Sequence, residues 1–313
     1  MEWNKLRRYL KPETVEETDK KGFMSSIYTA KDHEDNELII HEIKPVKEQE
    51  KHNIHKKIKY VSKVLTSFPE IPNAEVIHTG ERNNKWIIIQ KKLPGKTSGK
   101  RDVIGKEIID IYDKPEVKPQ TLRILARLHT IRFPKHGIIK DRNGFVDGKY
   151  ASWKEYLMTQ SHEWMNNLKE SSQKIRNLFE KYELEKNVNK LFLKDKLFIC
   201  RHPRLIHGDM LNPGNILHEE GRVTGIIDFE WAIAGDPAWE FAYKRPEDLN
   251  VYYREAEKLG TKIPKKLFEE KIKIYNLLWL LWGANVHIDG NKKVQRILLE
   301  QFINRLRRYN HSQ

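Results

Sequence analysis

Three acidic or amide side chains within one short stretch have types and spacing that could carry out chemistry. Asp209 follows an apolar segment, Asn215 lies six residues further on, and Asp228 ends a second apolar segment. Amide and carboxylate oxygens are suitable Mg²⁺ ligands, and a further carboxylate can orient a hydroxyl and accept its proton. The set therefore suits phosphoryl transfer from a magnesium-bound nucleotide. Taken alone, it also suits ordinary turns, where Asp, Asn and Gly are common.

Three runs of sequence surround this set. They are Leu205-Ile-His-Gly-Asp-Met-Leu-Asn-Pro-Gly-Asn-Ile-Leu, Gly225-Ile-Ile-Asp-Phe-Glu-Trp-Ala and Gly235-Asp-Pro-Ala-Trp-Glu-Phe-Ala. Together they closely resemble the aminoglycoside phosphotransferase family, which shares the protein-kinase-like fold with choline, homoserine and fructosamine kinases. The resemblance is specific within residues 205–241 and diffuse over most of the remaining chain.

The resemblance implies a role for each residue that matches a family motif. Asp209 would be the catalytic base, and Asn215 and Asp228 would be the magnesium ligands. His207 would pack and hydrogen-bond to position the loop, and Asp236 would tie the following helix to the catalytic loop. The implied cofactors are ATP and Mg²⁺, and the implied partner is a small-molecule substrate that accepts the phosphoryl group on a hydroxyl.

The spacing of the catalytic loop departs from the family pattern. The family usually has the asparagine one residue nearer to the aspartate than Asn215 is to Asp209. Either the loop bulges by one residue, or Asn212 takes a share of the metal binding. The Pro-Gly-Asn-Ile-Leu context matches the family at Asn215, so we predict a bulged but working loop.

Weaker matches place the nucleotide against the first part of the chain. Leu93-Pro-Gly95, just after Gln90, resembles the hinge whose backbone hydrogen-bonds adenine. Ser25 and Ser26 lie in a stretch that resembles the turn over the phosphates, where backbone N–H groups bind anions. We therefore predict that Ser25, Ser26, Gln90 and Leu93 contact the nucleotide.

The phosphate-binding lysine of the family's third strand has two candidates. By register His41 occupies its place, but a histidine is only partly charged at neutral pH, and Lys44 follows three residues later. The helix glutamate that would pair with this lysine is also displaced, because Lys57 falls near its position and Glu50 lies two turns earlier. We take Lys44 and Glu50 as the predicted pair.

Hydrophobic periodicity predicts the elements that must position these residues. The first part of the chain reads as strands with one helix near 47–66; the strands are 26–30, 36–43, 75–78 and 85–90. The rest reads as helices, at 121–129, 153–168, 267–282 and 294–309, with a β island at 204–228. This predicts an α+β, protein-kinase-like fold of two lobes. Residues 1–94 would form a β-rich N-terminal nucleotide-binding lobe with one long helix, and residues 95–313 a mostly helical catalytic and substrate lobe with an insertion near 150–200.

Composition narrows the setting. The net charge of +14 invites a nucleic-acid partner, but the densest lysines, at 44–63 and including Lys57, alternate with apolar residues as in an amphipathic helix with a solvated basic face. No nucleic-acid motif accompanies them, which argues against a nucleic-acid partner. The most apolar run, 277–282, is too short to cross a membrane, and a single cysteine, Cys200, fits a reducing, cytoplasmic location.

Two alternatives to an active kinase stay open from the sequence. One is a catalytically weak nucleotide-binding pseudokinase, and the other is a basic nucleic-acid-binding protein. Glu230, Trp231 and Trp239 are candidates to face the acceptor, with the core as the alternative for Trp239. The mixed charges suit a neutral or anionic metabolite at least as well as an aminoglycoside. The sequence specifies neither the acceptor nor the oligomeric state.

Overall fold

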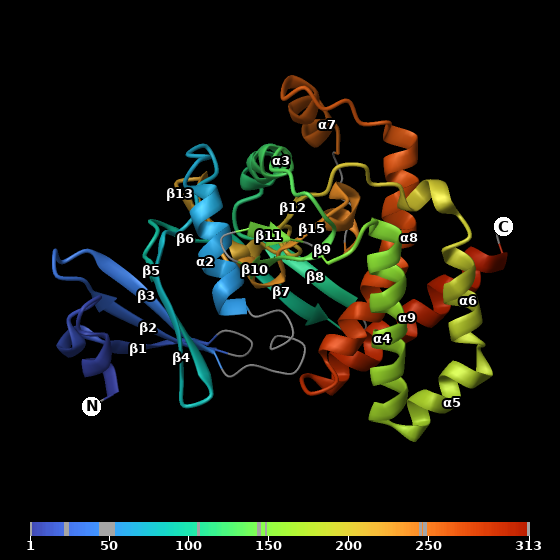
Figure 1. The fold of residues 1–313 in the computed structure, drawn as a ribbon, viewed down its shortest axis with the longest axis horizontal. Helices are drawn as coiled ribbons and strands as arrows, with labels where there is room; N and C mark the ends of the chain where they lie inside the picture. Colours follow the sequence, from blue (N-terminus) through green and yellow to red (C-terminus); the bar gives the residue numbers. More distant parts are fainter. Residues whose placement is uncertain are drawn as a thin grey trace.

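Five strands near the N-terminus form one antiparallel sheet in the computed structural model, which describes residues 2–21, 25–43, 54–104, 107–142, 145–147, 149–243, 246 and 249–311. The strand order is β1-β2-β3-β5-β4. The strands are β1 (Glu16–Lys21), β2 (Ser25–Lys31), β3 (Glu37–Ile43), β4 (Val76–Arg82) and β5 (Lys85–Lys91). In Figure 1 this sheet lies at the left, and the C-terminal helices lie at the right.

The two faces of this sheet have different cover because side chains alternate along each strand. On β3, Leu38 and Ile40 pack in one apolar cluster with Leu10, which follows the short helix η1 (Glu2–Leu6). On the opposite face, Ile43 packs with Ile54 of helix α2 (Ile54–Leu65). The sheet is thus held between the N-terminal segment and α2.

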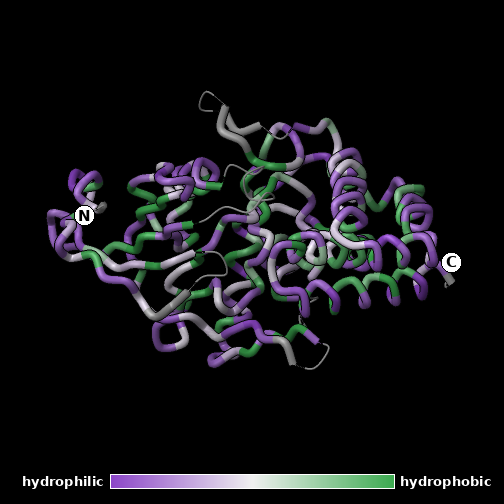
Figure 2. The backbone as a smooth tube through the Cα atoms, turned by 90° about the horizontal axis from the view of Figure 1, so that it is seen from below, coloured by the Kyte–Doolittle hydropathy of each residue, from purple (hydrophilic) through white to green (hydrophobic). Residues whose placement is uncertain are grey.

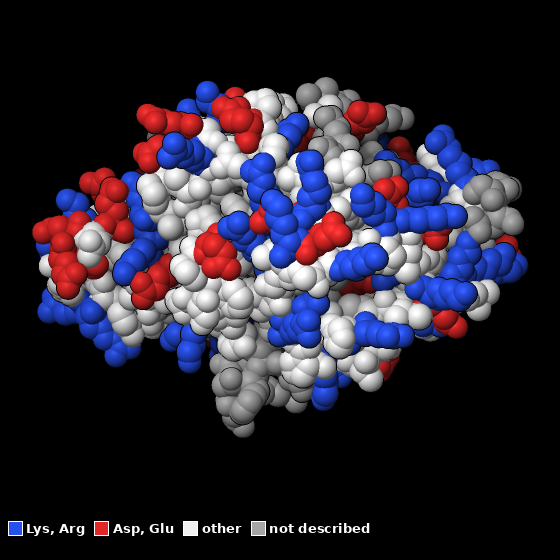
Figure 3. All heavy atoms as spheres, turned by 90° about the horizontal axis from the view of Figure 1, so that it is seen from above, with Lys and Arg blue, Asp and Glu red and all other residues white. Residues whose placement is uncertain are grey.

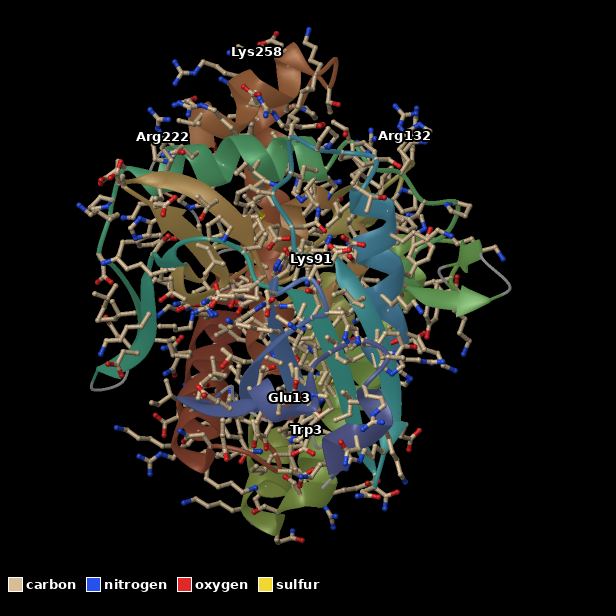
Figure 4. All side chains as sticks on the ribbon, turned by 90° about the vertical axis from the view of Figure 1, so that its left-hand side faces the viewer. Trp3, Glu13, Lys91, Arg132, Arg222 and Lys258 are labelled. Carbon is tan, nitrogen blue, oxygen red and sulfur yellow. The ribbon has the colours of Figure 1, made fainter. Side chains whose placement is uncertain are left out.

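The second half of the chain is mostly helical and contains the main apolar core. Its helices are α3 (Val117–Leu128), α4 (Trp153–Ser171), α5 (Gln173–Lys181), α6 (Leu184–Leu191), α7 (Leu249–Lys258), α8 (Lys265–Val286) and α9 (Lys292–His311). Along the helical coils at the right of Figure 2, hydrophobic and hydrophilic segments alternate, as expected of helices packed on one side. Figure 4 shows α7, marked by Lys258, beside α3 at one end of the molecule, and these two helices are in contact.

Short strands and turns from distant parts of the chain form the middle of the molecule. Two small sheets have the strand orders β12-β15-β9 and β14-β13-β6. Their strands are β6 (Lys96–Thr97), β9 (Gly137–Ile138), β12 (Arg204–Ile206), β13 (Ile216–Glu219), β14 (Arg222–Ile226) and β15 (Ile233–Gly235). A hairpin of β7 (Gly99–Ile104) and β8 (Glu107–Tyr112) and a second one of β10 (Lys140–Arg142) and β11 (Phe145–Asp147) complete the strands among the described residues.

The predicted α+β architecture, with a β-rich first part and a helical second part, is confirmed. The β7–β8 hairpin was not predicted, although the isoleucines and the tyrosine of β8 are residues that favour a strand. One prediction is wrong: Lys57 is fully buried and does not lie on a solvated face of α2. The first part of the predicted helix, before Ile54, lies outside the described residues, and the lobe boundary at 94–95 stays a prediction.

None of the described helices is both long enough and apolar enough to cross a membrane.

A buried histidine at the end of α3 gives a pH-dependent prediction. His129 Nδ1 lies 2.7 Å from the Tyr252 hydroxyl, and burial lowers the His129 pKa to about 3. The unfolded chain takes up a proton at this residue near pH 6.5, so the stability it contributes is complete above that pH and is lost as the pH falls. We expect the destabilisation caused by His129→Gln to shrink by about 2 kcal/mol between about pH 7.5 and about pH 5, in urea unfolding. A difference that stays constant with pH would contradict this, and the exposed His162→Gln is the matched control.

Candidate active site

The side chain of Asp209 lies at the centre of a set of donors. Arg101 Nη1 donates to Asp209 Oδ1 at 2.5 Å. Asn212 Nδ2 and Asn215 Nδ2 donate to Asp209 Oδ2 at 2.9 and 3.1 Å. The structure thus brings Asn215 to Asp209 despite the long spacing in the sequence.

Two successive tight turns take up the extra residue in this loop. The N–H of Asn212 donates to the Asp209 carbonyl at 3.2 Å, and the N–H of Asn215 donates to the Asn212 carbonyl at 2.9 Å. The side-chain oxygen of Asn212 accepts the N–H of Gly214 at 3.0 Å, so both ends of this amide have partners within the loop. The amide nitrogen of Asn215 is directed to Asp209, which leaves its carbonyl oxygen as the group that could bind a metal. This geometry favours Asn215 over Asn212 as a ligand.

Asp228 follows β14 and is held close to the same loop. The N–H of Ile227 donates to the backbone carbonyl of Asn215 at 3.0 Å. The residue before Asp228 is therefore fixed to Asn215, the other predicted magnesium ligand. Asp228 has a left-handed backbone conformation, with φ of 70°. Its side chain is accessible to solvent, yet the protein around it and the charge of Asp209 raise its pKa to about 7. Burial and the charge of Asp228 likewise raise the pKa of Glu230.

The predicted metal ligands are of a kind that suits a magnesium ion. The oxygens of Asn215 and Asp228 are hard ligands, and the raised pKa values of Asp228 and Glu230 mark a place where a cation would relieve repulsion between carboxylates. Among the described residues no cluster of three or more His, Cys, Asp or Glu could hold a metal by itself. Mg²⁺ typically binds one or two carboxylates together with substrate phosphates, so two protein ligands suffice.

His207 positions the loop as a neutral side chain. It is fully buried, and burial lowers its pKa to about 4. Its Nε2–H donates to the Ile227 carbonyl at 3.0 Å, and its Nδ1 accepts the N–H of Asp209 at 3.3 Å. At the next residue, Gly208, φ is +89° and a Cβ would lie 2.8 Å from the Trp231 carbonyl oxygen, so glycine is required.

Glu240 holds the loop from behind. Its carboxylate accepts the N–H groups of His207 at 2.8 Å, Gly208 at 3.0 Å and Met210 at 3.0 Å. Burial raises its pKa to about 7. The resemblance had implied that Asp236 makes this link.

Asp236 instead fixes the helices that follow. It caps η6 (Pro237–Phe241) through the N–H of Ala238, and it pairs with Lys271 at 2.5 Å and Tyr275 at 3.1 Å. Its described hydrogen bonds therefore stabilise the helical core. The contact with the catalytic loop that the resemblance implied for Asp236 is not among them, so that prediction is corrected. The role of Glu240 was missed because this residue lies in a buried turn of apolar residues and its spacing matches no motif.

The predicted hinge lies beside the β island. A Cβ on Gly225 would lie 2.6 Å from Leu93 Cδ1 and 3.1 Å from Leu217 Cδ1, so these two leucines converge on β14. The Pro94 carbonyl accepts the Thr224 hydroxyl at 2.7 Å. Among the described residues, the backbone of Leu93 makes no hydrogen bond, which suits its predicted role toward adenine.

The other predicted nucleotide contacts are distributed over the sheet. Ser25 and Ser26 begin β2 and pair with Ile43 and Glu42 of β3. The Nε2 atoms of Gln90 and His41 are 3.3 Å apart, and burial lowers the pKa of His41 to about 4. The predicted pair, Lys44 and Glu50, lies outside the described residues.

Sequence reasoning missed Arg101 entirely. Besides Asp209 it contacts Asp110, Nε to Oδ1 at 2.7 Å, and its guanidinium lies 4.0 Å from the ring centroid of Tyr243. The side chain of Asp110 is only 2% exposed, and the arginine forms ion pairs with both carboxylates at once. The isoleucines of β8 could have located that strand, but not the position of the hairpin beside Asp209.

The three residues suggested to face the acceptor separate in the structure. Trp239 is buried among Trp153 and Tyr275, with ring centroids 5.9 and 6.0 Å away, and belongs to the core. Trp231 packs edge-on against Trp282 at 5.1 Å. Glu230 is close enough to Asp228 and Lys57 to perturb the pKa values of both.

Solved structures of other proteins show the same fold. A thermostable mutant of the aminoglycoside phosphotransferase APH(4)-Ia, in ternary complex with ADP and hygromycin B, is similar over 94% of this chain and 93% of that chain, with 17% identity and a TM-score of 0.61. The GDP and kanamycin complex of APH(2″)-IIia matches over 94% and 93%, with 15% identity and a TM-score of 0.60. Macrolide 2′-phosphotransferase MphH from Brachybacterium faecium matches over 97% and 96%, with 15% identity and a TM-score of 0.59. The predicted protein-kinase-like fold is therefore confirmed.

The family follows from the sequence match. The phosphotransferase enzyme family matches residues 32–244, a range that includes every described residue of the catalytic loop. The chain therefore belongs to the aminoglycoside phosphotransferase (APH) family of phosphotransferases. A search of curated proteins found no match.

Proposed function

We propose that this protein transfers the γ-phosphoryl group of magnesium-bound ATP to a hydroxyl of a small molecule. The observation that supports the proposal most directly is the convergence of Asp209, Asn215 and Asp228 through the two-turn loop and Ile227. The ADP complex of a structural neighbour supports a nucleotide site, and the single cysteine supports action in the cytoplasm.

In the proposed reaction, this chain supplies positioning and charge. Asp209 orients the acceptor hydroxyl and takes its proton, while Asn215 and Asp228 hold Mg²⁺, which supplies charge neutralisation on the phosphates when bound. Leu93 and Leu217 would face the adenine. Arg101 holds Asp209 Oδ1, so an acceptor hydroxyl must share that oxygen or displace the arginine.

A weak or inactive nucleotide-binding protein is the second candidate. It is favoured by two observations: the Arg101–Asp209 ion pair, and the neutral His41 where the resemblance predicts a phosphate-binding cation. A nucleic-acid partner has less support. On the face seen in Figure 3, basic side chains predominate over the middle and the right, but acidic side chains are interspersed among them.

A binding titration and an acceptor screen test the proposal. We expect ATP with Mg²⁺ to raise the melting temperature, and a screen of sugars, amino alcohols, aminoglycosides and macrolides to yield one phosphorylated class by mass spectrometry. Asp228→Asn should weaken binding of the magnesium–ATP complex by about 10-fold or more while sparing metal-free nucleotide. The exposed Asp289→Asn is the matched control. Stabilisation by ATP with no turnover of any acceptor would favour the second candidate.

A further inference from the structure

Helix α2 carries a lysine where its own geometry calls for an apolar residue. Ile54, Val61 and Leu65 are buried along one side of the helix, and Lys57 lies among them with 0% exposure. Lysine is almost never fully buried unless an opposite charge accompanies it. The charge of Lys57 must therefore act on something inside the molecule.

The groups around this lysine come from the metal-binding segment. Helix α2 packs against η5 (Phe229–Trp231), which directly follows Asp228. Asp228 and Glu230 are the carboxylates whose charges act on Lys57. A cation of the N-terminal half thus lies close to the carboxylates of Glu230 and of the predicted magnesium ligand Asp228.

The strand position that the resemblance assigns to a lysine holds no cation. His41 pairs with Ile88 on the face of the sheet that α2 covers, where Ile88 and Ile54 share one apolar cluster. The hydrogen bond with the Gln90 amide needs an unprotonated acceptor nitrogen on His41. His41 and Lys57 therefore line the same side of the sheet. Burial lowers the pKa of Lys57 to about 7, against the charges of Glu230 and Asp228, whereas the pKa of His41 falls to about 4, so of these two residues Lys57 is the one that carries positive charge near neutral pH.

We propose that Lys57 supplies, from helix α2, the positive charge that binds the nucleotide phosphates and holds the Asp228 segment against them. In this chain the cation is Lys57 of the helix, near the position where the resemblance predicts a glutamate, and not a residue of the strand. The inference rests on the proposed function. It assigns the phosphate-binding charge to Lys57, whereas the sequence predicted the pair Lys44 and Glu50.

The test separates binding of the phosphates from binding of the nucleoside. Lys57→Met fills the apolar stripe with a side chain of similar length, so we expect the variant to fold. Its affinity for magnesium–ATP, measured by calorimetry, should fall about 30-fold or more, and its affinity for adenosine, which has no phosphates, should stay unchanged. Lys59→Met, at an exposed position of the same helix, is the matched control and should bind both ligands as the wild type does.

A charge relocation provides an independent measurement. Lys57→Glu should abolish detectable ATP binding, and adding His41→Lys should restore at least a tenth of the wild-type affinity, because the strand lysine and helix glutamate then stand in the order that the resemblance predicts. Unchanged ATP affinity in Lys57→Met, or equal losses for ATP and adenosine, would overturn the role of Lys57. Failure of the wild-type protein to bind ATP would instead refute the proposed function.

Discussion

Asp209→Ala should reduce phosphoryl transfer by about 10²–10⁴-fold, the range typical of losing a positioned general base. Alanine can neither orient the acceptor hydroxyl nor accept its proton. Nucleotide affinity should stay within a few-fold of wild type, since the proposed metal ligands Asn215 and Asp228 remain. Initial rates with the acceptor from the screen, together with ATP calorimetry, measure both quantities.

The fold should tolerate this change. Arg101 keeps its ion pair with Asp110 at 2.7 Å and its contact with Tyr243 at 4.0 Å when Asp209 is removed. Asp209→Asn is the shape-conserving control: it should lose activity to a similar extent, because an amide cannot take the proton. Wild-type turnover in either variant would show that Asp209 is not the base.

Glu240→Ala should lower the free energy of unfolding by about 3–5 kcal/mol, since each buried N–H group that loses its acceptor costs about 1–3 kcal/mol. Three backbone N–H groups, those of His207, Gly208 and Met210, would lose their acceptor in a buried place. These residues flank Asp209, so turnover should also fall under conditions where the variant is fully folded. Urea unfolding and initial rates below the unfolding transition measure the two effects.

Two further variants define the cause. Glu240→Gln retains one acceptor oxygen and should show an intermediate loss of stability. Glu257→Ala removes a glutamate at an exposed position of α7 and should change stability by less than about 0.5 kcal/mol. If Glu240→Ala were as stable as Glu257→Ala, the three hydrogen bonds would not be holding the loop.

The elements that the sequence predicted well are those with strong local periodicity. Helices α3, α4, α8 and α9 and strands β2 to β5 all fall where apolar residues repeat at helical or strand spacing. The β7–β8 hairpin was missed because charged residues interrupt its alternation, and several of its apolar side chains are only partly buried. The burial of Lys57 was missed because composition alone assigns lysine to solvent.

The sequence by itself predicted the chemistry that we propose for Asp209, Asn215 and Asp228. These residues lie in one short segment, whose turns and hairpin join residues close together in the chain. Their order in the sequence therefore already brings them near one another. Only the tertiary structure decided what surrounds them. Arg101 is 108 residues from Asp209 in the chain, and Glu240 is 33 residues from His207. The charge of such residues is visible in a sequence, but their partners depend on how sheet, helix and loop pack, and no local pattern encodes that packing.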